Sequence, residues 1–281
     1  MRTTLSSLSL ALIASIAVGC FYGSPSSETL PQGAPLAPVR ADPVAGDPTT
    51  WPPVATFSIL AYDSVTGELG GAVQSRVYSV GNGVLWAEAD VGVVATQAIV
   101  DVSYGPQALE LLRAGVPAED VVRIVWERDP DPQPENWTKL GRQFAVVDAK
   151  GRVGVYTGPR ASNWAGHKTG THVTAQGNIL AGPPVVENMV AAYEAASGQH
   201  MAFRLLAALE AGQAAGGDTR GMQSAALLVV RKNGGVWLNN DVVLRLQVDD
   251  DPQPIAELRR LVEMQTNRLN RLLAQPRGGE R

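Results

Sequence analysis

The sequence predicts an α+β domain in which antiparallel sheets pack face to face and helices cover them. Three observations support this prediction. Strand-like segments come in groups that alternate with groups of helical segments. The strands within a group are joined by turns of hairpin length, which favours antiparallel over parallel pairing. The segment from residue 56 to residue 281 is long enough for one well-formed core, and it is expected to be a single domain.

The first group contains four expected strands. Thr56–Asp63 alternates side chains in the manner of a strand, and Glu68–Arg76 returns after a turn that contains Gly67. Val84–Asp90 and Gly92–Ile99 follow around a second short turn. These four consecutive strands are expected to form one N-terminal sheet.

Two helices and a hairpin come next. Gly105–Ala114 has a proline near its first turn, and Pro117–Arg128 carries valines at helical spacing. The strands Phe144–Asp148 and Arg152–Thr157 are expected to form a hairpin around a turn that ends in glycine.

The rest of the chain repeats the alternation. A loop is expected over Gly158–Gly170, then a strand at His172–Ala175, then helices at Pro184–Ala196 and Met201–Ala211. Two strands and one helix close the chain, at Ser224–Arg231, Leu244–Val248 and Pro254–Ala274. The last helix is amphipathic, and packing of its apolar stripe onto its own domain is favoured over pairing of subunits, although an oligomer stays open.

The first 55 residues predict a bacterial lipoprotein. Residues 1–19 have a basic start, a short apolar run and small residues before a cysteine, as in a signal peptide. This spacing resembles the bacterial lipobox, which implies that Cys20 is the lipidated residue. Residues 20–55 are rich in Pro, Ser and Ala and are expected to be an extended tether. The expected location is therefore the cell envelope, at the outer membrane or on the periplasmic face, and the alternative is an ordinary signal peptide.

Composition and motifs exclude several classes of function. A net charge of −4 and a pI near 5.5 argue against a nucleic-acid partner. There is no G-x-S-x-G, Walker or H-E-x-x-H signature. His167 and His172 are poorly spaced for a zinc pair, and the simpler interpretation of His167 is a positioned loop histidine. No metal and no cofactor are expected.

Three polar clusters lie beside expected strand ends, where ligands often bind. Each of them is also compatible with an ordinary turn. The clusters are Gln74-Ser75-Arg76, Thr96-Gln97 leading into Ser103–Pro106, and Gly216–Ser224.

Several short stretches are distinctive in their number, order and spacing. They are Thr56–Ile59, Ala95–Ala98, Ser103–Pro106, Trp164–His167, Gln176–Pro183, Ala215–Asp218 and Gln223–Leu227. Through them nearly the whole domain, Thr56 to about Leu273, resembles a bacterial family called domain of unknown function 1028.

The resemblance implies the fold of N-terminal nucleophile hydrolases, a four-layer αββα sandwich. In that superfamily a Thr, Ser or Cys at the start of the first strand attacks an amide, and its freed α-amine acts as the base. Thr56 is then the expected nucleophile, with Gln97 near the oxyanion; the alternative for Thr56 is an ordinary β-branched strand residue. The expected catalytic residues are Thr56, Arg76, Gln97 and Asp218, and the expected substrate-binding residues are Ser75, Tyr104, His167, Asn178 and Ser224.

The predicted function is an envelope-anchored amidohydrolase-like protein that acts on a small amide or peptide-like substrate. This chemistry requires cleavage between Ala55 and Thr56, because Thr56 follows a leader and a tether. The alternatives are a non-catalytic ligand-binding or interaction lipoprotein with the same sandwich fold, and a structural envelope protein.

Overall fold

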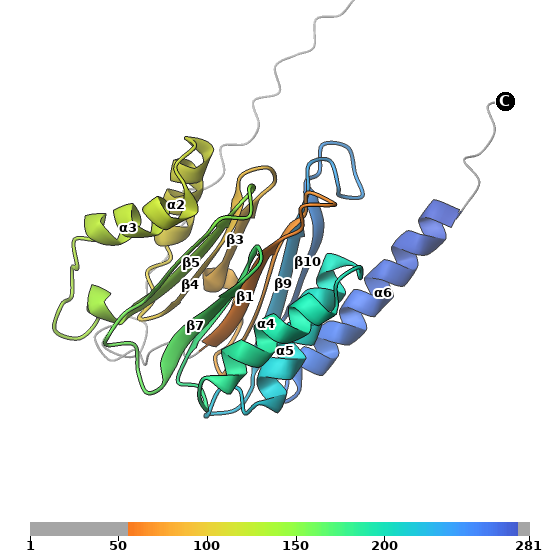
Figure 1. Cartoon of the computed structure of the whole chain (residues 1–281). Helices are drawn as coiled ribbons and strands as arrows, with labels where there is room; N and C mark the ends of the chain where they lie inside the picture. Colours follow the sequence, from red (N-terminus) through yellow and green to blue (C-terminus); the bar gives the residue numbers. More distant parts are fainter. Residues whose placement is uncertain (1–55, 275–281) are drawn as a thin grey trace, which may run out of the picture. The chain divides into compact units, whose positions relative to one another are not determined.

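The computed structural model of the chain describes residues 56–274, with side chains through residue 268. The predicted signal peptide, Cys20 and the tether lie outside the described residues. Within them, two antiparallel sheets combine with six α-helices (Figure 1). The predicted α+β class is therefore confirmed.

The larger sheet has six strands in the order β10-β9-β2-β1-β8-β7, and each neighbouring pair is antiparallel. Strand β1 lies inside it, between β2 and β8. Its strands are β1 (Thr56–Tyr62), β2 (Leu69–Ser75), β7 (Ala165–Gly170), β8 (Val173–Asn178), β9 (Ser224–Val230) and β10 (Val242–Val248).

The smaller sheet has four strands in the order β3-β4-β5-β6, again antiparallel. It faces the larger sheet, since β4 and β5 contact β1 while β3 contacts β9. Its strands are β3 (Leu85–Glu88), β4 (Gly92–Ala98), β5 (Arg142–Asp148) and β6 (Val153–Thr157).

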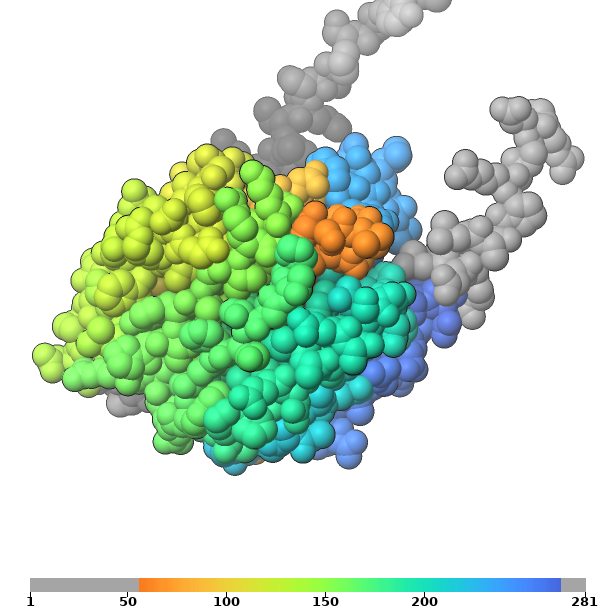
Figure 2. All heavy atoms as spheres, viewed as in Figure 1, coloured from red at the N-terminus to blue at the C-terminus, as the bar shows by residue number. Residues whose placement is uncertain are grey.

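Helices cover the outer face of each sheet. Two helices pack on the four-stranded sheet and three on the six-stranded sheet, so that the domain is layered helix, sheet, sheet, helix (Figure 1). Figure 2 shows α4 and α5 (teal) as a continuous outer surface beside the segment that contains β7 (green). The first set is α2 (Tyr104–Arg113) and α3 (Ala118–Arg128), the second is α4 (Pro184–Ala195), α5 (Met201–Ala214) and α6 (Pro254–Ala274), and the short α1 (Gly81–Val84) precedes β3.

Strand alternation divides the buried side chains into three cores. On β1, Phe57 and Ile59 face the helices α4 to α6, whereas Leu60 faces the other sheet. On β5, Phe144 faces α2 and α3, whereas Ala145 faces the other sheet. Successive side chains of a strand point to opposite faces, so each central strand contributes to two cores at once.

The four N-terminal strands do not form one sheet, and that prediction was wrong. Strands β1 and β2 belong to the six-stranded sheet, and β3 and β4 belong to the four-stranded sheet. Residues 76–84 and the short α1 carry the chain from one sheet to the other. Strand β2 pairs instead with β9, from Leu69 against Val230 to Ser75 against Ser224. Alternation along a strand predicts its faces but not its partner.

The expected loop over Gly158–Gly170 contains strand β7, which the sequence did not predict. Its residues, AGHKTG, include two glycines and have no apolar alternation. It is an edge strand that pairs only with β8, in a register that sets His167 opposite Gln176. The pairing with β8 forms the strand, because its own residues have low strand propensity.

The C-terminal helix has the predicted bounds and packs onto its own domain. Ile255, Leu258 and Val262 are buried in the core between the helices and the six-stranded sheet. No helix within residues 56–274 is both long and apolar enough to cross a lipid bilayer.

Candidate functional site

Thr56 lies at one end of the layer between the two sheets, and this end is polar. The alternation that directs Leu60 toward the four-stranded sheet also directs Thr56 and Ser58 that way. From the opposite sheet, Gln97 and Gln143 face them, since they share a strand face with Ala95 and Ala145. The buried polar side chains of this end are Thr56, Ser58, Ser75, Gln97, Gln143, Thr174, Gln176 and Asn178, and together we call them the polar end.

The side chain and carbonyl group of Thr56 both contact the polar end. Its Oγ1 donates a hydrogen bond to Ser75 Oγ at 3.2 Å, and its carbonyl oxygen accepts one from Gln97 Nε2 at 3.4 Å. In the two neighbouring strands, Thr56 is registered against Ser75 and Asn178. Its exposed fraction is 0%, so the hydroxyl does not reach solvent in the intact chain.

Side-chain amides connect the strands of the polar end. Gln97 Nε2 donates to Gln143 Oε1 at 2.7 Å. Ser58 Oγ donates to Gln97 Oε1 and accepts from Gln176 Nε2, both at 2.6 Å. Gln143 Nε2 in turn donates to Thr157 Oγ1 and to the carbonyl oxygen of Gly177. The network therefore links strands from both sheets through directional bonds.

The sequence did not single out Ser58, Gln143 or Gln176, although they are central to this network. The available signal was a polar residue within an otherwise apolar strand, such as Gln143 ahead of Phe144–Val147. One such residue is weak evidence by itself. Only the sheet pairing shows that three of them meet.

Asn178 has an unused hydrogen-bond acceptor within the described residues. Its Nδ2 donates to Gln143 Oε1 at 3.2 Å, while its Oδ1 is buried and has no partner there. Buried polar atoms are nearly always paired, with protein or with ordered water. The unpaired oxygen is suited to accept a hydrogen bond from a water molecule or from a ligand group.

Two strands of the polar end terminate in strained backbone. Ala98 directly follows Gln97 and has φ of 67°, and Ile179 directly follows Asn178 and has φ of 53°. The left-handed region is costly for a β-branched residue such as isoleucine. Strain of about 1–3 kcal/mol per residue is typical of functional sites. The side chains of Gln97 and Asn178 are therefore each followed by a residue whose strained backbone conformation is maintained by the surrounding fold.

Asp218 and Arg76 meet next to Ser75, as part of a loop that closes the edge of the polar end. Asp218 Oδ2 accepts a hydrogen bond from the backbone nitrogen of Arg76 at 3.3 Å, and the carboxylate also pairs with Arg220 at 2.8 Å. The Arg76 side chain is exposed, and its Nη1 donates to the carbonyl oxygen of Met222. Asp218 therefore positions the backbone that follows Ser75.

Ser224 is registered against Ser75, but its hydroxyl serves the neighbouring turn. Its Oγ donates to the carbonyl oxygen of Val77 at 2.6 Å and accepts from the backbone nitrogen of Val80 at 3.1 Å. These two bonds fix the segment that leads to the other sheet.

His167 lies on the edge strand β7 and reaches the network through Thr157. Its Nδ1 is 3.0 Å from Thr157 Oγ1, which also accepts a hydrogen bond from Gln143. The residue is exposed overall, yet partial desolvation of the ring lowers the pKa of His167. A neutral imidazole is favoured at this position.

Tyr104 lies on the opposite face of the four-stranded sheet from the polar end. Its ring packs against Phe144 in the core formed with α2 and α3, and its hydroxyl donates to Asp129 Oδ2 at 2.6 Å. Burial, together with this carboxylate, raises the pKa of Tyr104. Burial also acts to raise the pKa of Asp129, but bonds from Tyr104, the Asp131 backbone and Arg142 outweigh it and lower that pKa. The four-stranded sheet therefore lies between Tyr104, on helix α2, and the polar end.

One small apolar pocket lies beyond the ends of β2 and β4, and no side chain of the polar end lines it. Its volume is about 150 Å³, and it is lined by the segment after β2 and the segment after β4. Its walls include Val77, Val80 and Val100. Among the described residues, no group of three or more His, Cys, Asp or Glu side chains could hold a metal ion.

Comparisons with known proteins identify relatives of this chain. The family described as "Family of unknown function (DUF1028)" matches residues 56–258. A crystal structure of protein SPO2555 from Silicibacter pomeroyi, assigned to the same family, is 33% identical. The match covers 75% of this chain and 86% of that chain, with a TM-score of 0.67. No curated protein matches the sequence. The chain therefore belongs to the DUF1028 family.

Proposed function

We propose that the domain is an amide hydrolase of the N-terminal nucleophile type, with Thr56 as the nucleophile. Its substrate is a small amide or a peptide-like molecule, and it works in the bacterial cell envelope. The observation that carries the proposal is the position of Thr56. It is the first residue of a central strand, and its hydroxyl bonds to Ser75 within a buried polar cluster.

The proposed reaction uses the hydroxyl and the α-amine of the same residue. After cleavage before Thr56, its free amine takes the hydroxyl proton as Oγ1 attacks the substrate carbonyl carbon. The tetrahedral intermediate collapses to an ester of Thr56, and the leaving amine receives the proton. Water then attacks the ester with the α-amine again as base, which releases the acid and restores the hydroxyl.

The surrounding residues support this chemistry by their placement. Gln97 Nε2 donates to Gln143 Oε1 and, over 3.4 Å, to the Thr56 carbonyl oxygen; in the proposed reaction the second, longer bond is given up and the same N–H serves the developing oxyanion. Asp218 holds the backbone after Ser75, and Asn178 offers an unpaired oxygen to a substrate N–H group. The apolar pocket of about 150 Å³ beyond the ends of β2 and β4 has room for a small aliphatic group.

Activation by cleavage also has a consequence for location. In the intact chain Thr56 is fully buried and follows Ala55 in the sequence. Cleavage at this bond would separate the domain from the proposed lipid on Cys20. We therefore propose that the anchored chain is the inactive form and that the released domain is the active form.

The test combines intact-mass analysis with a reactive probe. We expect native protein to include a population that begins at Thr56 and gains the mass of a peptide epoxyketone, which reacts with a hydroxyl and an adjacent amine. Thr56→Val should abolish this mass gain, and Thr66→Val in an exposed turn should not. As a second experiment, a protease site inserted before Thr56 allows the domain to be released with Thr56 as its first residue. The mechanism is excluded if every native molecule keeps residues ahead of Thr56 and the domain released in this way also fails to react with the probe.

Non-catalytic ligand binding is the second candidate, favoured by the complete burial of Thr56 in the intact chain. In that role the polar end would hold a ligand through its amides without covalent chemistry. A ligand-dependent increase in the melting temperature of the intact chain would then survive Thr56→Ala. Loss of the whole increase in a folded Thr56→Ala protein would contradict this candidate.

A further inference from the structure

The end of the domain opposite Thr56 exposes apolar side chains on two adjacent turns. Strand β2 pairs with both β1 and β9, so the β1–β2 turn and the β9–β10 turn lie at the same end of the sheet. Figure 2 shows the β9–β10 turn (light blue) as a surface projection beside the β1–β2 turn (orange). The exposed fractions are 92% for Val65, 77% for Trp237 and 96% for Leu238.

The tip of the β9–β10 turn carries no charge. From Asn233 to Asn240 it consists of glycine, asparagine and three apolar residues, Val236, Trp237 and Leu238. Such a tip can leave water without burying an ionised group. Tryptophan is the residue most suited to the boundary between water and lipid, because its ring is apolar and its N–H is polar.

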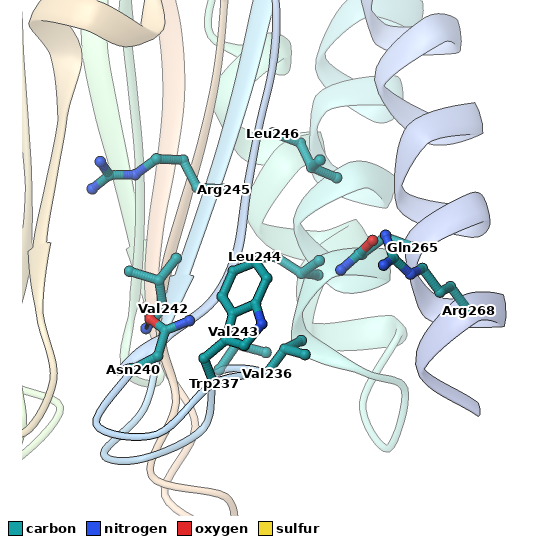
Figure 3. Close-up of a pocket in the computed structure, with 10 residues that line it drawn as sticks. All are labelled: Val236, Trp237, Asn240, Val242, Val243, Leu244, Arg245, Leu246, Gln265 and Arg268. Atoms are coloured by element: carbon teal, nitrogen blue, oxygen red, sulfur yellow. Dashed lines mark hydrogen bonds between the residues drawn. The ribbon is translucent and has the colours of Figure 1, made fainter. Parts of the chain in front are cut away.

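A groove with an apolar floor lies behind the tip. Its volume is about 350 Å³, and Leu244 and Leu246 of β10 form part of its floor (Figure 3). Figure 3 shows Val236 and Trp237 on one side of the groove and Arg268 of α6 on the other. Arg245 points away from α6, to the other face of β10.

Positive charge dominates the rim of this surface. The nearby acidic side chains are already paired, Glu68 with Arg231 and Asp241 with Lys232. No carboxylate within the described residues pairs with Arg268. The cations Arg231 and Lys232 are neutralised by these two pairs, so the unpaired Arg268 is what makes the rim cationic, although the whole chain has a net charge of −4.

We propose that the β1–β2 and β9–β10 turns, together with the distal half of α6, bind the surface of a bilayer that contains anionic phospholipid. The exposed tip enters the interface, and the cationic rim attracts the lipid phosphates. Pairing with a second copy fits less well, because it would bring the unpaired Arg268 of both copies into one interface without an acidic partner. Binding in this way keeps the polar end at the opposite end of β1, away from the lipid.

The test measures quenching of tryptophan fluorescence by brominated acyl chains. Full-length chain is mixed with vesicles of brominated phosphatidylcholine and phosphatidylglycerol in equal amounts. We expect a decrease in fluorescence that is mostly lost in Trp237→Phe and retained in Trp126→Phe, whose ring packs against Tyr156. The chain has six tryptophans, so the difference between the unchanged chain and Trp237→Phe isolates the depth of one side chain. Membrane contact through any other part of the chain does not mimic this difference.

Partitioning measurements then separate the apolar and electrostatic contributions. Leu238→Ser should weaken vesicle binding, whereas Tyr78→Ser, which removes a side chain of similar exposure (68%), should not. Arg268→Gln should reduce binding to the anionic vesicles roughly fivefold and leave neutral vesicles unaffected.

Three outcomes would overturn the proposal. The first is quenching that persists in Trp237→Phe, and the second is equal quenching by vesicles of brominated phosphatidylcholine alone. The third is that no quenching occurs and the chain instead forms a concentration-dependent dimer that Leu238→Ser disrupts. The last outcome would assign the surface to a second copy of the chain.

Discussion

The two ends of the layer between the sheets are built by the same strands but differ in chemistry. Leu60 lies two positions after Ser58 on β1, and Ala145 lies two positions after Gln143 on β5, so each pair shares a strand face. At one end the sheets are held by non-directional apolar packing, and at the other by hydrogen bonds that each need a specific partner. A buried polar network with paired members fixes one arrangement of the two sheets, which apolar packing does less strictly.

The apolar end is expected to be the most sensitive to truncation. Leu60→Ala should lower the free energy of unfolding by about 2–5 kcal/mol, because it removes a fully buried side chain and leaves a cavity. Urea denaturation measures this loss. Val65→Ala, in an exposed turn, should change stability by less than about 0.5 kcal/mol. A small effect of Leu60→Ala would mean that the sheets can close around the gap.

At the polar end, a single substitution is expected to lower the free energy of unfolding less than at the apolar end, and the effects of two substitutions are expected to be strongly coupled. Gln143→Met should cost about 1–3 kcal/mol, because it leaves the amide donors of Gln97 and Asn178 without their acceptor. Adding Gln97→Met should cost less than the sum of the two single changes, since the second change removes a donor that the first left unpaired. Additive costs in the double-mutant cycle would show that the amides act independently.

Ser224 tests whether the turn beside the polar end depends on side-chain bonds. Ser224→Ala should reduce the free energy of unfolding by about 1 kcal/mol, because the backbone N–H of Val80 loses its acceptor. In Ser224→Ala, amide hydrogen exchange at Val80 should be faster than in the unchanged chain, while exchange at Ile59 in the middle of β1 should stay the same. Unchanged exchange at Val80 would indicate that water replaces the hydroxyl.

The smallest expected effect is the pH dependence that comes from His167. Its pKa is lowered in the folded chain, so the unfolded chain binds the proton more tightly. Stability should therefore decrease as pH falls below the unfolded pKa of about 6.5 and level off below the folded pKa. Urea midpoints between pH 8 and pH 5 measure this slope, and His167→Gln should remove its share of it. An identical slope in His167→Gln would assign the dependence to other groups.

The parts of the fold that sequence predicts are those with local causes. The strand periodicity over Thr56–Tyr62, the amphipathic helix over Pro254–Ala274 and the turn glycines are set by neighbouring residues. Edge strand β7 escaped prediction because its pairing partner, rather than its own residues, makes it a strand. The meeting of Thr56, Ser75 and Gln97 was expected only from the family resemblance.

By itself the sequence determined the α+β class, the order of most of the elements and the buried face of the strands with apolar alternation, because these follow from side-chain periodicity and turn chemistry. Only the tertiary structure decided which strands share a sheet. It separated β1 and β2 from β3 and β4, brought Ser58, Gln143 and Gln176 to Thr56, and set Tyr104 on the other side of the sheet. The physical reason is that strand pairing is non-local: alternation fixes the face of a side chain but leaves its partner to the packing of the whole domain.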